Sequence, residues 1–298
     1  PASHDGLAAA EFHGRIERDW WLSSFSALTR NARHGGTSAR DRDQDEQEET
    51  QPHAEADNIR FCLQKGAEAG NLLHDVLEWL DFSNPDLDGV LDQAERRYPG
   101  LMAPAETTRE PIKAWLRELL AVKLPSGATL GALAPEKTLR ESEFYFPMNA
   151  DQHPPLGRIL ARHRGVDAAV TLPPPASLNG MLQGFIDLVY EWQGRYYIVD
   201  YKSNHLGNGF GHYNPEALTA NMRESFYDLQ YLLYMLALHR FLRIRIPDYD
   251  PEQHLGGVHY LYLRGMAPGR DTGVHAREPD LSALLALDAL FEGREVAV

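Results

Sequence analysis

The stretch GMLQGFIDLVYEW, residues 180–192, is followed by RYYIVDYKS at residues 195–203. Both stretches are rich in β-branched and aromatic residues, which favour strands. Gln193-Gly194 separates them, and a glycine-containing dipeptide between two such runs is typical of a tight turn. The sequence therefore predicts a β-hairpin over residues 180–203.

Polar side chains fall on one side of this hairpin. Side chains alternate between the two faces of a strand, which puts Asp200 and Lys202 on one face. Antiparallel pairing can bring Asp187, on the first strand, beside Asp200. The other residues expected on these two faces are Phe185, Val189, Tyr196 and Ile198.

Two carboxylates and an ammonium group suit the hydrolysis of a phosphodiester bond. Hard cations such as Mg²⁺ prefer oxygen ligands, and a bound metal polarises a phosphoryl oxygen and acidifies water. A nearby lysine can orient that water or stabilise the charge that develops on phosphorus. These residues indicate a metal-dependent nuclease centred on Asp187, Asp200 and Lys202.

An exposed ion pair is the alternative interpretation, because Asp-x-Lys is common at strand ends. Asp187 weighs against it, since its neighbours Ile186 and Leu188 are apolar. An ionised carboxylate in such surroundings is costly unless it is paired or binds a metal. On the residues alone, the two interpretations carry about equal weight.

The rest of the chain predicts an α/β domain with a small mixed sheet. Apolar residues recur at helical spacing in residues 66–80. Residues 13–30 indicate an extended piece and a helix start with serine caps, and residues 173–175 a proline-rich loop. Further helices are expected at 86–99, 109–123, 156–164, 223–243 and 280–292, and further strands at 143–148 and 256–265.

The charge is unevenly distributed. The net charge of the 298 residues is −14, which taken alone argues against a nucleic-acid partner. Residues 41–57 contain eight acids and one arginine, so half of the excess lies in one stretch. We expect a flexible acidic loop at about 31–57, and acids that surround a bound metal would not repel DNA.

The composition excludes several classes of protein. No apolar run approaches the ~18 residues that span a bilayer, and no signal peptide is recognisable, so we expect no membrane partner. Cys62 is the single cysteine, which excludes an intramolecular disulfide and a four-cysteine iron–sulfur nuclease. A cytoplasmic location fits this cysteine usage best.

The hairpin sequence GFIDLVYEW-QG-RYYIVDYKSN resembles the RecB-type branch of the PD-(D/E)xK nucleases. Four further stretches resemble the same branch in the same order: GNLLHDVLE, ESEFYFP, YDLQYLLYMLALHRFL and GGVHYLYLRGM. The resemblance implies a restriction-endonuclease-like fold, with a central mixed sheet flanked by helices. It also implies a tail at residues 1–12 and a nuclease domain at residues 13–298.

The resemblance assigns roles to residues of this sequence. It implies Mg²⁺, or Mn²⁺ as a substitute, bound by His74, Asp187, Asp200 and the carbonyl oxygen of Tyr201. It makes Lys202 the catalytic lysine. The remaining site residues that it implies are Glu143, for a second metal or an ordered water, and Gln230 and Tyr234, which contact the lysine region or DNA.

Plainer interpretations stand beside these roles. His74 alone fits an ordinary histidine of an amphipathic helix, and Glu143 fits a strand-edge acid. Tyr234 fits a core aromatic residue. We expect Glu78 to be a charge on the helix surface and Asp75 to face solvent.

The resemblance also implies partners. They are the ends of single- and double-stranded DNA and the RecC and RecD subunits of a helicase–nuclease that processes double-strand breaks for recombination. No GxxxxGK[ST] loop occurs here, so the chain itself is not expected to hydrolyse ATP. The alternative function is an interaction module that docks the recombinase RecA or these partner subunits.

Overall fold

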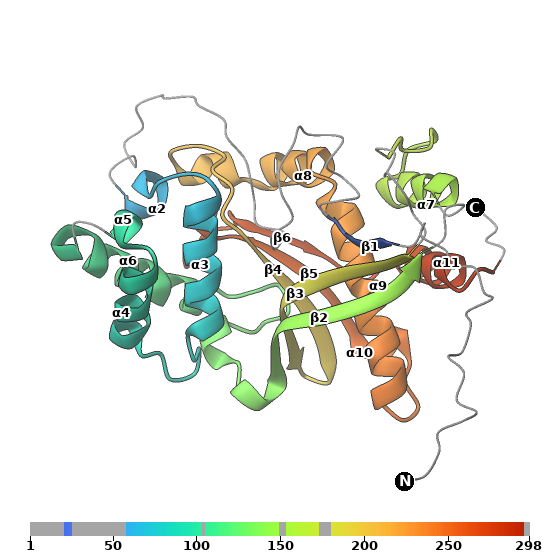
Figure 1. The fold of residues 1–298 in the computed structure, drawn as a ribbon, viewed down its shortest axis with the longest axis horizontal. Helices are drawn as coiled ribbons and strands as arrows, with labels where there is room; N and C mark the ends of the chain where they lie inside the picture. The colour runs from blue at the N-terminus through green and yellow to red at the C-terminus, as the bar shows by residue number, and fades with distance from the viewer. Residues whose placement is uncertain (1–20, 26–57, 103–104, 149–152, 173–179, 295–298) are drawn as a thin grey trace, which may run out of the picture.

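The computed structural model describes residues 21–25, 58–102, 105–148, 153–172 and 180–294 (Figure 1). The expected tail at 1–12, the acidic loop at 31–57 and the proline-rich loop at 173–175 lie outside these residues. Of the segment 13–30, only residues 21–25 are described, and residues 21–24 form a strand.

The predicted hairpin is confirmed by strands β3 (Gly180–Trp192) and β4 (Arg195–Lys202). They pair antiparallel from Leu188 opposite Val199 to Trp192 opposite Arg195. Gln193 and Gly194 form the turn with φ angles of 52° and 80°. Two positive φ angles are typical of a type I′ turn, whose twist matches that of the strands it joins.

The hairpin is the centre of one mixed sheet, as expected. Strand β2 pairs antiparallel with β3, and β1 pairs parallel with β3. Strand β5 pairs parallel with β4, and β6 pairs antiparallel with β5. Strand β1 lies within the segment 13–30, where the sequence predicts an extended piece, whereas β6 was not predicted. The bounds of the four strands beside the hairpin are β1 Trp21–Ser24, β2 Thr138–Met148, β5 Leu255–Tyr262 and β6 Val274–Arg277.

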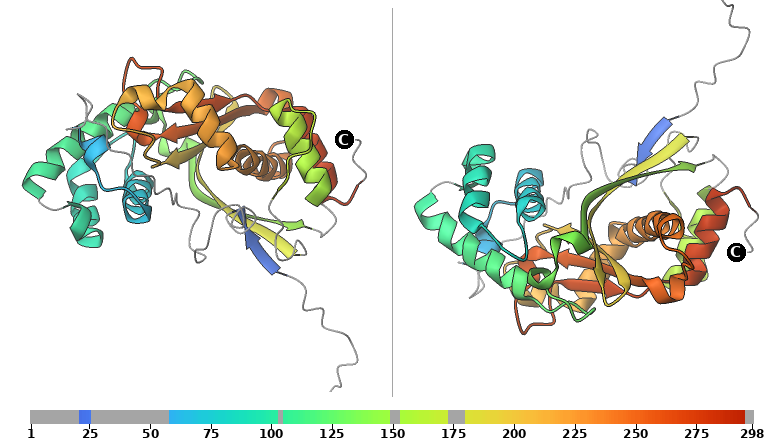
Figure 2. Two further views of the ribbon diagram at one scale, coloured as in Figure 1. Left: turned by 90° about the horizontal axis from the view of Figure 1, so that it is seen from above. Right: turned by 90° about the horizontal axis from the view of Figure 1, so that it is seen from below.

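Helices cover the sheet from two sides (Figure 2). One group holds α2 (Ile59–Cys62), α3 (Ala67–Trp79), α4 (Leu87–Arg97), α5 (Pro99–Met102) and α6 (Ala105–Ala121). The other holds α7 (His153–Arg164), α8 (Pro215–Glu224), α9 (Tyr227–Arg245) and α11 (Leu281–Phe291), with α10 (Pro251–His254) before β5. Short 3-10 turns lie at Leu130–Ala132, Pro135–Lys137, Phe210–Tyr213 and Leu263–Gly265.

Alternation along β4 divides the hydrophobic core between these groups. Ile198 packs with α9 and α11, whereas Val199 on the opposite face packs with α3 and α6. Both faces of the central strands are therefore buried, which explains why β4 reads as a nearly continuous apolar run.

The helix expected at 223–243 corresponds to α9, which begins later, at Tyr227, because a break separates it from the end of α8. The break falls at Phe226, which has a left-handed φ of 56°. Arg164 of α7 holds the break, because its guanidinium stacks over the Phe226 ring at 5.2 Å and donates two hydrogen bonds to Asp228. Helical spacing of apolar residues continues across such a break, so the sequence pattern does not reveal it.

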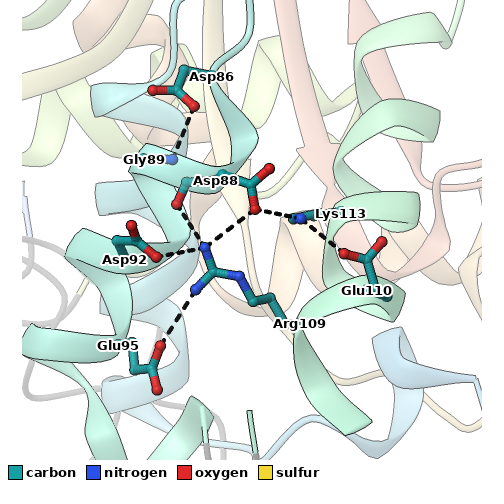
Figure 3. Close-up of polar contacts among 8 residues, drawn as sticks. All are labelled: Asp86, Asp88, Gly89, Asp92, Glu95, Arg109, Glu110 and Lys113. Atoms are coloured by element: carbon teal, nitrogen blue, oxygen red, sulfur yellow. Dashed lines mark hydrogen bonds and ion pairs between the residues drawn. The ribbon is translucent and has the colours of Figure 1, made fainter. Parts of the chain in front are cut away.

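Two arginines join distant segments in different ways. Arg264 is 1% exposed and donates to the backbone carbonyls of Ser203, Arg60, Leu63 and Gln64 at 2.7–3.0 Å. Figure 3 shows the other case, in which Arg109 of α6 bonds Asp88, Asp92 and Glu95 along α4 at the surface.

No helix among the described residues is long and apolar enough to cross a membrane.

We expect Arg264→Met to reduce the free energy of unfolding by about 3 kcal/mol or more, because it strands buried carbonyl groups. Urea titration followed by circular dichroism measures this loss. The matched control is Arg109→Met, whose exposed ion pairs contribute little. Equal losses in the two variants would contradict this account of Arg264.

Candidate active site

The β3–β4 hairpin opens at the end opposite its turn. The ladder ends with Leu188 opposite Val199, one step before Asp187 and Asp200. There the Asp187 carboxylate takes the place of a backbone acceptor, and its Oδ2 accepts a hydrogen bond of 2.7 Å from the N–H of Tyr201. Asp187 therefore joins the two strands at the point where they separate.

Helix α3 places His74 over this opening. His74 is 5% exposed, and its Nδ1 lies 3.5 Å from Oδ1 of Asp187. Burial acts to raise the pKa of Asp187, but His74 and the Tyr201 N–H hold that pKa below its usual value. An ionised carboxylate is the form that binds a metal.

Two contacts fix α3 in this position. Arg140 of β2 donates to the carbonyls of Leu77 and Glu78 at the C-terminal end of α3. Gly70 lies one turn before His74, and a Cβ at Gly70 would lie 2.9 Å from Oγ of Ser203. The helix therefore packs directly against the end of β4, and its position depends on the small residue.

A third acid comes from β2. Glu141 has a left-handed φ of 46° and lies between the pairs Arg140–Leu188 and Ser142–Ile186. That register sets Glu141 opposite Asp187. A positive φ is unfavourable for glutamate, and such strain is typical of functional sites.

The three side chains form a set that could hold a cation. One ligand atom from each of His74, Glu141 and Asp187 can be chosen so that all lie within 4.8 Å of one another. Two carboxylates and an imidazole suit Mg²⁺ or Mn²⁺. The set combines the sheet with helix α3, more than a hundred residues away from Asp187 in the sequence.

Asp200 and Lys202 lie side by side on β4, as predicted. Lys202 is 2% exposed, and its Nζ lies 2.9 Å from Oδ2 of Asp200. The aromatic ring of Tyr227 lies 3.7 Å from the same Nζ. A buried ammonium group is stable only with such partners, so this is no exposed ion pair.

Gln230 and Tyr234 share one face of α9, as predicted. The Gln230 amide Nε2 donates to the Tyr234 hydroxyl at 3.0 Å, and its Oε1 lies 3.5 Å from Nζ of Lys202. The hydroxyl of Tyr260 donates to the same Oε1 at 2.9 Å. Burial raises the pKa of Tyr260 well above its usual value, so this hydroxyl remains a donor.

Other candidate residues lie elsewhere. Glu143 is exposed and accepts hydrogen bonds from Tyr145 and Gln183, and the structure does not bring it into the His74 set. Asp75 is buried against Arg97 and Tyr98, so the expectation that it faces solvent is wrong. Glu78 is half-buried on α3.

Sequence reasoning missed Glu141. The signal was present in ESEFYFP, where two glutamates are two residues apart. Strict alternation puts both on the same face, so it offers no reason to choose between them. The register of β2 on β3 separates them, because Glu141 lies opposite Asp187 whereas Glu143 lies opposite Phe185.

Comparison with known families gives one match that covers most of the chain. A family model described as the PD-(D/E)XK nuclease superfamily matches residues 52–290. This range includes all the residues of the site.

Curated relatives carry the name RecBCD enzyme subunit RecB. The protein from Escherichia coli (strain K12) is 38% identical over 237 residues, which are 77% of this chain and 19% of the relative. The protein from Haemophilus influenzae is 32% identical over an alignment of 311 positions that covers 97% of this chain and 25% of the relative. The Mycobacterium tuberculosis (strain CDC 1551) protein is 33% identical over an alignment of 341 positions that covers 99% of this chain and 31% of the relative. The chain thus spans less than a third of the length of each.

The structure predicts different effects for the two glutamates of β2. We expect Glu141→Gln to weaken Mn²⁺ binding at least about tenfold, because it removes one charged ligand. Glu143→Gln is the matched control and should leave the affinity unchanged. Calorimetric titration of the 298-residue protein measures both.

His74→Ala should weaken Mn²⁺ binding in the same experiment, since it removes the ligand that α3 supplies. If Glu143→Gln weakened binding and Glu141→Gln did not, the assignment of the third ligand would be wrong.

Proposed function

The chain belongs to the PD-(D/E)XK nuclease superfamily, and from this membership and the geometry of the site we propose that it is a Mg²⁺-dependent DNA nuclease domain. Its reaction is the hydrolysis of phosphodiester bonds. The observation that carries the proposal is the opening between β3 and β4, where His74, Glu141 and Asp187 converge beside the buried Asp200–Lys202 pair.

His74, Glu141 and Asp187 hold the cation, and Asp200 with the carbonyl oxygen of Tyr201 offers oxygen ligands from the β4 side. When bound, the cation polarises the scissile phosphate and lowers the pKa of a coordinated water. Mg²⁺ fits a site dominated by carboxylate oxygens, and Mn²⁺ can replace it.

Lys202 acts on the reacting phosphate. Its ammonium group, held by Asp200, donates to the attacking water or to the phosphoryl oxygens as negative charge develops there. Because Lys202 is buried, this charge acts in a region of low dielectric constant, where its effect on the transition state is large. Gln230 and Tyr234 fix the polar surroundings of the lysine.

The names of the relatives suggest a larger assembly. We infer that the chain is the nuclease part of a RecB subunit, which works in the cytoplasm with RecC and RecD at the ends of single- and double-stranded DNA. The parent enzyme would unwind and degrade DNA during double-strand break repair and recombination. Its exodeoxyribonuclease activity would reside in this domain.

The purified 298-residue protein should degrade linear single-stranded DNA with Mg²⁺ and stop when EDTA is added. Asp200→Asn and Lys202→Gln should each lower kcat at least about 100-fold, because each removes transition-state stabilisation. The matched controls are Asp167→Asn and Lys123→Gln, both exposed and outside the site. Release of labelled nucleotides measures the rates.

Full activity of Asp200→Asn or Lys202→Gln in folded protein would refute the site. Docking is tested separately, by pull-down of RecC, RecD or RecA with the same variants. Capture that survives the loss of cleavage would show that binding of partners is a distinct property of the domain.

A further inference from the structure

The ammonium group of Lys202 is enclosed by side chains from three elements. Nζ lies 3.7 Å from the ring centroid of Tyr227 on α9 and 5.4 Å from that of Tyr260 on β5. The carboxylate of Asp200 lies at 2.9 Å and the amide oxygen of Gln230 at 3.5 Å. The ammonium group of Lys202 is therefore surrounded by both aromatic rings and oxygen atoms.

Tyr260 supports the orientation in which the oxygen of the Gln230 amide meets the lysine. Its hydroxyl donates to Oε1 of Gln230 at 2.9 Å, while Nε2 donates to Tyr234 at 3.0 Å. In this orientation the amide oxygen points to the ammonium group. The reversed amide would bring a donor against a donor, and no hydrogen bond could form with Lys202.

Tyr227 is held by the break between α8 and α9. It follows Phe226, whose φ is 56°, and precedes Asp228, which forms a buried ion pair with Arg164. The Tyr227 and Tyr260 rings lie 6.0 Å apart with a tilt of 33°. The ring of Tyr227 thus has a fixed position in the first turn of α9.

We propose that Tyr227 and Tyr260 are positioning residues for the nuclease reaction, which hold the Lys202 ammonium at the site through a cation–π contact and through the Gln230 amide. This inference rests on the proposed function, because it assigns Lys202 the reacting role. A cation over a desolvated aromatic face is held more strongly than at an exposed site. Tyr227 and Tyr260 thus extend the proposed active site by two residues that lie outside the Asp-x-Lys and Gln-x-x-x-Tyr motifs.

Kinetics on single-stranded DNA give the first test. Tyr227→Leu should lower kcat about tenfold with little change in KM. Tyr227→Phe keeps the ring and should therefore retain most of the wild-type kcat. Tyr260→Phe should lower kcat about threefold to tenfold, because Gln230 loses the donor that fixes it.

Tyr231 provides matched controls, because it lies one turn along α9 and its hydroxyl bonds His163 instead of Gln230. Tyr231→Leu removes a buried ring from the same helix, and Tyr231→Phe removes a buried hydroxyl. Both should change kcat less than the corresponding variants of Tyr227 and Tyr260.

Lysine NMR gives a readout that does not depend on cleavage. The chain has five lysines, Lys65, Lys113, Lys123, Lys137 and Lys202, so ¹³C-labelled lysine gives few signals. The Lys202 Hε signal, assigned by its loss in Lys202→Gln, should lie upfield because of the Tyr227 ring current. It should move downfield in Tyr227→Leu and stay upfield in Tyr227→Phe.

The role of Tyr227 would be overturned if, in folded Tyr227→Leu, the Lys202 signal stayed at its wild-type position and kcat was no lower than in Tyr231→Leu. If Tyr227→Leu does not fold, either of two results would overturn the proposal: a Lys202 signal that does not lie upfield in the wild-type protein, or a kcat of Tyr260→Phe equal to that of Tyr231→Phe. If the wild-type protein cleaves no DNA with any divalent cation, the proposed function fails, and the NMR arm alone decides whether the two tyrosines hold the lysine.

Discussion

The site depends on one hydrogen bond, from the backbone N–H of Tyr201 to the carboxylate of Asp187. A regular hairpin would join the strands there through backbone groups and leave no opening. Because a side chain accepts the bond instead, β4 can turn toward β5 while β3 continues with β2 and β1, which curve away together in Figure 2. The same carboxylate faces His74, so one residue both joins the separating strands and meets the side chain that α3 brings to the site.

Buried charge is the second organising feature. Lys202, Asp200 and Arg264 are all buried, and each has polar or charged partners. Removing a charged group from water costs several kcal/mol unless partners compensate. Two non-glycine residues with a positive φ lie beside the site. Glu141 is opposite Asp187, and Phe226 directly precedes Tyr227. Strain of about 1–3 kcal/mol per residue persists only where the surrounding packing fixes it, as Arg164 does at Phe226.

Local pattern predicted the parts of the fold that local chemistry determines. The Gln193-Gly194 turn, β3, β4 and α3 follow from turn residues and apolar spacing, and the mixed sheet follows from their order. The resemblance to PD-(D/E)xK nucleases is confirmed by the family match. The sequence could not predict the pairing of β1 with β3, because it joins residues more than 150 positions apart. It could not separate Glu141 from Glu143, because the register of β2 on β3 decides which of them meets Asp187. It could not place Asp75 inside, because a tertiary ion pair with Arg97 determines that position.

The proposed ligand set of the site is shared between two structural layers. His74 belongs to the helical layer with α3, α4 and α6, whereas Glu141 and Asp187 belong to the sheet. A cation held by all three acts as a crosslink between the layers, and its binding free energy adds to that of their association. By thermodynamic linkage the reverse also holds, and any partner or DNA strand that pulls α3 away from β2 lowers the affinity for the cation. Because α3 supplies one of the three ligands, the fraction of sites that hold a cation depends on how closely the helical layer packs against the sheet.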